Sequence, residues 1–186
     1  MSEPVLGWAV IALFALHRLL ELPFARANAR RLVAAGARTV RADGLLALVA
    51  VHVAVVAGVA LERGLGGARM PGGAGVAALV ALVPVEALRV WTLATLGRRW
   101  TVRVVVVPDE TPVRAGPYRW LRHPNYVVVA LEVVLVPFAV GAWRTALAAA
   151  LPTLLALRHR VRLEEAAWRA VAATPLGPDV SRGAAS

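Results

Sequence analysis

The stretch GLLALVAVHVAVVAGVAL at residues 44–61 holds a single ionisable side chain, that of His52. A run of this length and composition fits a helix that crosses a lipid bilayer, whose hydrocarbon core takes about 20 mostly apolar residues. Similar apolar blocks lie on either side of it, at residues 4–24 and 76–96. The sequence therefore predicts a protein for which the bilayer is the solvent around much of the chain.

The composition agrees with a membrane protein. Of the 186 residues, 59% are hydrophobic and 17% are charged, which leaves few polar residues to cover a soluble domain. The chain carries 21 basic and 11 acidic residues, and every basic residue is Arg. Because these arginines cluster between apolar blocks, we interpret them as topology signals and expect no nucleic-acid partner. The absence of Cys excludes disulfides and Cys-ligated metals, and no metal site is expected.

Two further apolar blocks, at residues 124–140 and 145–157, predict a helical hairpin with a tight connection between them. They are short, since about 14–17 residues at 1.5 Å each reach only about 21–26 Å of a core about 30 Å thick. A polar helix is expected to follow at residues 159–173. The expected fold class is an all-α integral membrane protein with about five transmembrane helices, a C-terminal helical hairpin and a cytoplasmic tail helix.

We expect residues 1–186 to form a single domain. Residues 1–96 would supply the first three helices, with a flexible Gly-rich loop at residues 62–75. Residues 97–173 would form the core of the functional site, with a short extended segment in TVRVVVVP that ends at Pro108. Residues 174–186 are predicted to be disordered.

The distribution of Arg predicts the orientation in the membrane. A loop after the first helix is expected to be rich in Arg, and it would contain Arg26, Arg30, Arg31, Arg38 and Arg41. The segment before the fourth helix and the C-terminal tail are also rich in Arg. The positive-inside rule then places the N-terminus outside and the C-terminus in the cytoplasm. A chain without Lys and rich in Ala, Val, Gly and Arg is typical of GC-rich bacteria, so we expect a bacterial cytoplasmic membrane.

Ionisable side chains inside the apolar blocks need an explanation, because each costs about 2.5–3.5 kcal/mol on insertion scales. Glu86 and Arg89 lie three residues apart and are expected to pair with each other. Glu132 has no basic neighbour in its own helix, so it should face the bundle interior or a wet cavity, in a structural or a functional role. His52 is expected to be a hydrogen-bonded packing residue.

The densest group of polar and aromatic residues is GPYRWLRHPNY, residues 116–126. It reads as a turn, two arginines, and then His123 directly before Pro124 at the start of a helix. A helix N-terminus presents free backbone N–H groups and the positive end of the helix dipole, which suit an anion. The alternative is an interfacial anchor of Arg and aromatic side chains.

The second group is RHRVRLEEAAW, which begins at Arg158. At helical spacing Arg158, Arg162 and Glu165 share one face, and Arg160 and Glu164 are expected to pair on another. One interpretation is a solvated helix with surface salt bridges. The other is that the two carboxylates, placed where the last membrane helix ends, bind hydroxyl or ammonium groups of a polar ligand.

With these two motifs the sequence resembles the isoprenylcysteine carboxyl methyltransferase family of membrane enzymes. GPYRWLRHPNY matches the family's Gly-x-Tyr … Arg-His-Pro-x-Tyr signature, and RVRLEE matches its closing Arg-x-x-x-Glu-Glu signature, with fitting order and spacing. The stretch HRLLELPFARANARRL, residues 17–32, and TLGRRWTVRV, residues 95–104, resemble a bacterial branch of the family. Members of that branch often accompany type III polyketide synthases and are thought to methylate hydroxyls of alkylpyrones or alkylresorcinols.

The resemblance implies an O-methyltransferase that uses S-adenosyl-L-methionine and acts on a lipophilic carboxylate or acidic hydroxyl, alkylpyrone-like, alkylresorcinol-like or prenylcysteine-like. The cofactor would enter from the cytoplasm, and the lipophilic small-molecule substrate would enter from the bilayer among membrane lipids. By position, the implied cofactor-binding residues are Tyr118, Arg122, His123, Pro124, Tyr126, Glu164 and Glu165.

The implied reaction suggests four catalytic candidates. Transfer to an acceptor that is already ionised needs mainly proximity and orientation, whereas a resorcinol-like hydroxyl with a pKa near 10 needs a base. His123 and Glu132 are the candidate bases. Arg122 and Arg162 are candidates to hold a carboxylate, of cofactor or substrate, because Arg binds carboxylates in a bidentate manner.

Two positions depart from the family pattern. Val128 stands where Gly is common, and it is predicted to narrow the space beside cofactor or substrate, while Thr153 stands where Asn is common. Two other functions stay open. One is phospholipid N-methylation, and the other is a non-enzymatic small transporter or scaffold, in which Glu86, Arg89 and Glu132 would mark an ion or substrate path.

Overall fold

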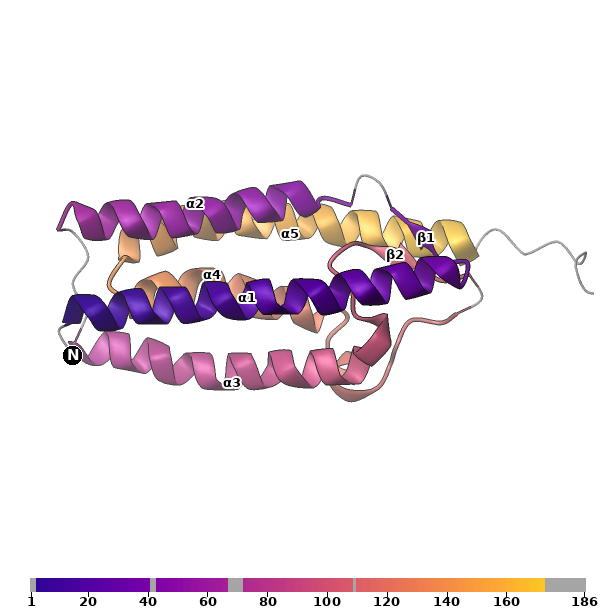
Figure 1. Cartoon of the computed structure of the whole chain (residues 1–186), viewed down its shortest axis with the longest axis horizontal. Helices are drawn as coiled ribbons and strands as arrows, with labels where there is room; N and C mark the ends of the chain where they lie inside the picture. Colours follow the sequence, from indigo (N-terminus) through magenta and orange to yellow (C-terminus); the bar gives the residue numbers. More distant parts are fainter. Residues whose placement is uncertain (1–2, 41–42, 67–71, 109, 173–186) are drawn as a thin grey trace, which may run out of the picture.

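A computed structural model of the chain describes residues 3–40, 43–66, 72–108 and 110–172. Within these ranges it contains five α-helices, which are α1 (Glu3–Ala34), α2 (Leu45–Gly64), α3 (Gly72–Leu96), α4 (Pro124–Ala139) and α5 (Trp143–Ala172). The same ranges hold two short strands, β1 (Arg38–Thr39) and β2 (Val105–Val106), and two 3-10 turns, η1 (Gly97–Arg99) and η2 (Gly116–Arg119). The helices lie side by side, and β1 and β2 lie together at one end of the bundle, here called the motif end (Figure 1).

The all-α membrane class is confirmed. Among the described residues, three helical stretches are long and apolar enough to cross a membrane, namely Gly7–Ala34, Leu45–Gly64 and Gly72–Arg99. Helix α4 is apolar but shorter, at 16 residues, in agreement with the short first helix predicted for the hairpin. Large apolar side chains such as Leu46 and Phe24 are exposed along the outer helices, as expected of surfaces that contact lipid acyl chains.

Helix α1 is longer than predicted, because it continues through Pro23 to Ala34. The prediction of an Arg-rich loop was therefore wrong for Arg26, Arg30 and Arg31, which lie on the helix. The segment after Pro23 is rich in Ala, Arg and Leu, all good helix formers, and the helix ends before Gly36 at a φ of 94°. Of the other loop arginines, Arg38 lies in β1 and Arg41 lies outside the described residues.

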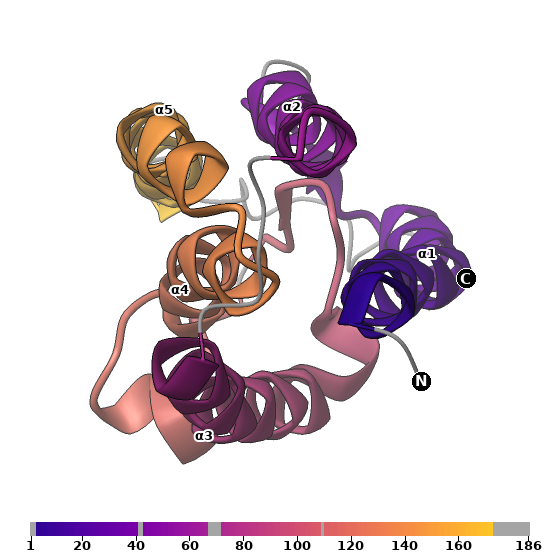
Figure 2. The ribbon, with the colours of Figure 1, turned by 90° about the vertical axis from the view of Figure 1, so that its left-hand side faces the viewer.

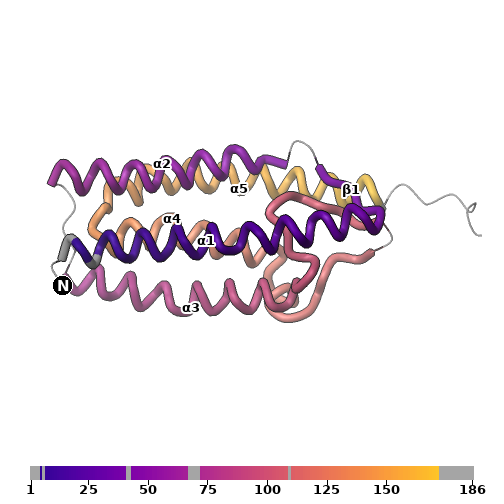
Figure 3. The backbone as a smooth tube through the Cα atoms, in the orientation of Figure 1, coloured from indigo at the N-terminus to yellow at the C-terminus, as the bar shows by residue number. Residues whose placement is uncertain are grey.

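Other predicted boundaries also moved. The Gly-rich loop was placed too widely, since α2 continues to Gly64 and α3 already begins at Gly72, while residues 67–71 lie outside the described part. The last membrane helix begins at Trp143, earlier than the predicted Thr145, and the polar tail continues it as predicted in one uninterrupted helix, α5, as Figure 3 shows. No Gly or Pro separates their sequences, so nothing ends the helix at the membrane surface. The predicted disordered tail, 174–186, lies outside the described residues.

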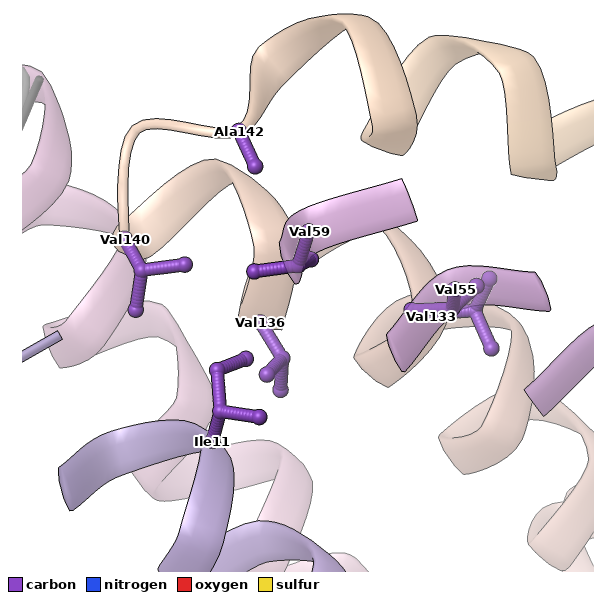
Figure 4. Close-up of a cluster of buried hydrophobic side chains, with 7 residues drawn as sticks. All are labelled: Ile11, Val55, Val59, Val133, Val136, Val140 and Ala142. Carbon is purple, nitrogen blue, oxygen red and sulfur yellow. The ribbon is translucent and has the colours of Figure 1, made fainter. Parts of the chain in front are cut away.

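Helix α4 lies at the centre of the bundle, between α3 and α5 (Figure 2). The main apolar cluster combines small and β-branched side chains from α1, α2, α4 and the connection after α4. Its members are Ile11, Val55, Val59, Val133, Val136, Val140 and Ala142 (Figure 4). Helix α2 approaches α5 closely at Gly58, where an added Cβ would lie 2.9 Å from Thr145 Cγ2. Small residues at helix contacts permit such close packing in membranes.

The loops at the motif end are tied to α5 by Arg160. Strand β1 pairs antiparallel with β2, which confirms a short extended segment after residue 101, with Arg38 opposite Val106. The Arg160 guanidinium, 4% exposed, donates to the backbone carbonyls of Asp43 (2.9 Å) and Val102. The Asp43 carboxylate lies 3.7 Å from the same guanidinium and accepts the backbone N–H of Val104 at 3.2 Å. Arg160 thus joins α5 to the segments before α2 and before β2.

We expect Arg160→Met to destabilise the protein by about 3 kcal/mol, because it leaves the buried Asp43 carboxylate without its cation. The matched control is Arg162→Met, which removes an exposed guanidinium from the same helix and should change stability little. Thermal unfolding followed by circular dichroism in detergent measures both. Equal unfolding midpoints for the two variants would contradict the role given to Arg160.

Candidate functional site

A cavity of about 450 Å³ lies between α2 and α5, and a larger one of about 910 Å³ lies at the motif end. The larger cavity is formed by η2, the start of α4, the strand region and the second half of α5, and its volume suits a small-molecule ligand. Six of the residues implied by the resemblance line it, namely Tyr118, Arg122, His123, Tyr126, Glu164 and Glu165.

The turn that presents Tyr118 depends on Gly116. Its φ is 53°, and an added Cβ would collide with the Thr95 hydroxyl and lie 3.2 Å from Trp91 Nε1 on α3. Only Gly fits both the backbone conformation and this contact. Pro117, next to Gly116, is buried, so η2 is fixed against α3. Tyr118 of the same turn forms part of the cavity wall.

The two sequence motifs meet at His123. This residue precedes α4, and its ring stacks on Tyr126 with ring centres 5.4 Å apart. Its Nδ1 lies 3.8 Å from Glu164 Oε2, and its Nε2 lies 3.6 Å from Glu165 Oε1. Pro124 starts the helix but is buried and lies outside the set that lines the cavity. Its fixed φ and missing N–H suit the first position of a helix.

The Tyr126 hydroxyl connects the two charged residues of the second motif. It donates to Glu164 Oε2 at 2.6 Å and accepts from Arg160 Nε at 3.0 Å. The predicted direct pair between Arg160 and Glu164 was therefore wrong, because Arg160 turns toward Asp43 and the loop carbonyls. The hydroxyl of Tyr126 thus bridges Arg160 and Glu164 through two hydrogen bonds.

Tyr118 is a neutral hydrogen-bonding group. Burial raises the pKa of its hydroxyl above the ordinary value of 10, and the negative charge of Glu164 raises the pKa further. The phenol therefore stays protonated at physiological pH and can donate a hydrogen bond to a ligand.

The remaining cavity wall carries both signs of charge. In all, seven Arg and three Glu side chains line the cavity. Besides Arg122, Glu164 and Glu165, these are Arg99, Arg103, Glu110, Arg114, Arg119, Arg160 and Arg169. Arg122 is 89% exposed and lies 3.8 Å from Glu165. Trp168 adds an aromatic surface one turn beyond the carboxylates. A cavity with both charge signs and a flat apolar surface suits a ligand that is zwitterionic and contains a ring system.

Some predicted residues lie elsewhere. Arg162 is exposed on α5, away from the cavity-lining set, and Glu132 is fully buried on α4. Val128 is also fully buried and does not line the cavity, so the predicted effect of its side chain on the space beside cofactor or substrate stays a prediction. Thr153 donates to the Ala149 carbonyl within its own helix at 2.6 Å. His52 makes the expected hydrogen-bonding contact, with the Leu48 carbonyl at 2.7 Å.

A second polar cluster lies deeper, between α1, α3 and α4. Glu132 faces the interior, as predicted, and pairs with Arg18 of α1. The expected pair of Glu86 with Arg89 was wrong, because α1 offers Arg89 a better partner. The Arg89 guanidinium binds both carboxylate oxygens of Glu21, with Nε to Oε1 at 2.7 Å.

Sequence reasoning missed the roles of three residues that organise or line the cavity. Arg160 occupies the Arg position of the closing signature, so a signal existed, but Arg162 was chosen as the candidate. Asp43 is 3% exposed and lies far from both motifs in sequence, so only the fold reveals its part. Trp168 follows the motif by one helical turn, and that spacing could have identified it.

Comparisons with known proteins agree with the motifs. The model of the isoprenylcysteine carboxyl methyltransferase (ICMT) family matches residues 77–170, from α3 to near the end of α5. The uncharacterized protein YpbQ of Bacillus subtilis (strain 168) is 29% identical over 164 residues, which cover 86% of this chain and 95% of that protein. No solved structure matches the chain.

We predict that Tyr118 resists ionisation. The chain has two tyrosines, so Tyr126→Phe leaves Tyr118 as the sole phenol, whose absorbance near 295 nm reports phenolate. A free tyrosine is half-ionised near pH 10. Because burial raises the pKa of Tyr118, little phenolate should form at pH 10 in the folded protein. The same variant in denaturant is the control and should titrate near pH 10. A folded midpoint near pH 10 would contradict the buried position.

Proposed function

The chain belongs to the isoprenylcysteine carboxyl methyltransferase family of membrane methyltransferases, and we propose that it transfers a methyl group from S-adenosyl-L-methionine to a lipophilic acceptor. The acceptor group is a carboxylate or an acidic hydroxyl, alkylpyrone-like, alkylresorcinol-like or prenylcysteine-like. The observation that carries the proposal is the meeting of the two motifs at His123, with Glu164 and Glu165 on one side of a large cavity.

The cavity fits the implied cofactor by the chemistry of its side chains. The cofactor combines an amino-acid group with a ribose and a purine base, so it needs acidic, basic and aromatic partners. Glu165 would bind the ammonium group or the ribose hydroxyls, and Arg122 would bind the carboxylate. Trp168 would offer a surface for the base. When bound, the cofactor supplies an electrophilic methyl group.

The residues of the chain supply position and hydrogen bonding. Arg160 and Tyr126 hold Glu164, and Gly116 fixes the turn that carries Tyr118. For an acceptor that is already ionised, this positioning is the main contribution. For a neutral hydroxyl a base is needed, and His123 is the candidate at the cavity, since its ring is oriented by two carboxylates. Of the two candidate arginines, Arg122 lines the cavity and Arg162 does not.

The proposal includes an orientation. The motif end holds the Arg-rich loops and the second half of α5, so we place it in the cytoplasm and the N-terminus outside (Figure 1). The water-soluble cofactor then reaches the cavity from the cytoplasm, and the lipophilic acceptor arrives from the bilayer. Phospholipid N-methylation shares the cofactor site, so an acceptor screen with labelled cofactor separates the two activities.

We predict that the detergent-purified protein binds S-adenosylhomocysteine in a calorimetric titration. Glu165→Gln should weaken this binding by about tenfold or more, because a charged hydrogen-bond partner is lost at the cavity wall. Glu86→Gln is the control, since it makes the same chemical change in the deeper cluster and should bind as the parent does. Absence of binding in a folded parent protein would overturn the proposal, and unchanged affinity of Glu165→Gln would overturn the role of Glu165.

A further inference from the structure

The smaller cavity, between α2 and α5, is an apolar groove with one polar end. It has a volume of about 450 Å³, and most of its lining side chains are small or apolar. On α2 the lining runs from Val51 to Leu65, and on α5 it runs from Arg144 to Pro152. The polar members lie at the end of the bundle away from the motif end, and they are Glu62, Arg144 and Thr145.

The apolar part of the groove is as long as one membrane leaflet is deep. From Val51 to Leu61 the wall formed by α2 rises about 15 Å, at 1.5 Å per residue. The hydrocarbon core of a bilayer is about 30 Å thick, so one leaflet contributes about 15 Å. Figure 2 shows α2 and α5 as neighbours on the outside of the bundle, and Ala54 and Ala148 in the groove walls are exposed. The groove therefore opens toward lipid and suits an acyl chain.

Two pairs of Arg and Trp mark the membrane boundary at the polar end. The Arg144 guanidinium lies 5.2 Å from the centre of the Trp143 ring, and the Arg63 guanidinium lies 5.6 Å from the centre of the Trp8 ring. Both Trp side chains are exposed. Trp is enriched at the level of the lipid headgroups, and long basic side chains extend to the same level. The polar end of the groove thus lies where lipid phosphates lie.

The Arg144 guanidinium is available to a ligand. The neighbouring Glu62 carboxylate is buried and is used by the start of α5, because it accepts the backbone N–H groups of Arg144 at 3.3 Å and Thr145 at 2.9 Å. It also accepts the Thr145 hydroxyl at 2.8 Å. Arg63 donates to the Val140 carbonyl at 2.7 Å. Arg144 is exposed and takes part in no ion pair among the described residues.

The charges at this end select the class of lipid. Arg63 and Arg144 supply two positive charges and Glu62 supplies one negative charge, so an anion is attracted. Arg binds phosphate in a bidentate manner. A headgroup that carries an ammonium group would bring a second cation to this end, whereas a phosphodiester of a neutral alcohol brings only negative charge. Because the groove is open toward the bilayer, the second acyl chain of such a lipid can stay among the surrounding lipids.

We propose that the groove between α2 and α5 binds one acyl chain of an anionic phospholipid from the leaflet away from the motif end, with the lipid phosphate on Arg144. This lipid is no methyl acceptor, because Arg144 and Glu164 lie about 30 Å apart along α5 at 1.5 Å per residue. The bound chain holds α2, whose main neighbour in the bundle is α5. The site is independent of the proposed function.

The test uses the full chain in mild detergent with equal amounts of dioleoylphosphatidylglycerol and dioleoylphosphatidylcholine, and native mass spectrometry counts the lipid that each chain retains. We expect the parent protein to retain one phosphatidylglycerol in preference to phosphatidylcholine. Arg144→Gln should weaken this retention by about tenfold, because a charged hydrogen-bond donor to the phosphate is lost. Arg158→Gln is the control, since it removes an exposed Arg further along the same helix and should retain the lipid as the parent does.

A second pair of variants tests the groove itself. Ala54→Leu fills it from the wall of α2 and should reduce retention, whereas Ala57→Leu adds the same side chain at an exposed position outside the lining set and should not.

Three results would overturn the site. One is unchanged retention in folded Arg144→Gln or Ala54→Leu, and another is equal retention of the two phospholipids by the parent. The third is a lipid-free dimer that Ala54→Leu dissociates, which would assign the groove to a second copy of the chain. Binding of S-adenosylhomocysteine should be the same in the parent and in all four variants. Its absence from the parent would overturn the methyltransferase proposal and leave the lipid site standing.

Discussion

The buried guanidinium of Arg160 is the contact on which the motif end depends. It reaches from α5 to the carbonyls of Asp43 and Val102 and to the hydroxyl of Tyr126, so one side chain fixes four segments that are far apart in sequence. Backbone carbonyls in such loops need donors, because burial within the protein separates them from water. Arg is suited to this task because its five N–H groups point in several directions from one rigid plane. The carboxylates of Glu164 and Glu165 are placed as a consequence, since they lie one turn further along the same helix.

A different kind of contact joins α1 to the bundle. Helices α3, α4 and α5 pack mainly through apolar side chains. Helix α1 adds polar contacts to the apolar contact of Ile11: Arg18 and Glu21 pair with residues of α4 and α3, and the amide of Asn28 donates to Trp100 O at 2.9 Å. Lipid tails are as apolar as Leu, so apolar side chains alone give a membrane helix little preference for a neighbour. Polar contacts supply that preference and also define where α1 can sit. The groups that hold α1 are therefore the same groups that form the deeper polar cluster.

The sequence predicted the membrane class, the five apolar blocks and the two motifs, because each of these is local in the chain. It also placed α4 almost to the residue, since Pro124 marks a helix start clearly. It failed where the answer depends on contacts between helices. Glu86 and Arg89 are neighbours on one helix, but residues of α1 compete for both, and no property of α3 alone reveals that. Arg160 lines the cavity and Arg162 does not, and the sequence could not show this, because the direction in which each side chain points is set by how α5 packs. The predicted residues on η2 and at the start of α4 lie together at the cavity because one short segment carries them, and their roles stay predictions.

The polar attachment of α1 has a practical consequence for handling the protein. Coulombic attraction between the partners Arg18 and Glu132, and between Arg89 and Glu21, is strong in a medium of low dielectric and weak where water penetrates. A thick bilayer keeps these pairs dry, but a small or water-permeable micelle does not. We therefore expect solubilisation in a harsh detergent to loosen α1 before it disturbs the apolar contacts of α3, α4 and α5. Extraction in lipid nanodiscs or in mild detergents with added lipid preserves the arrangement of the first helix.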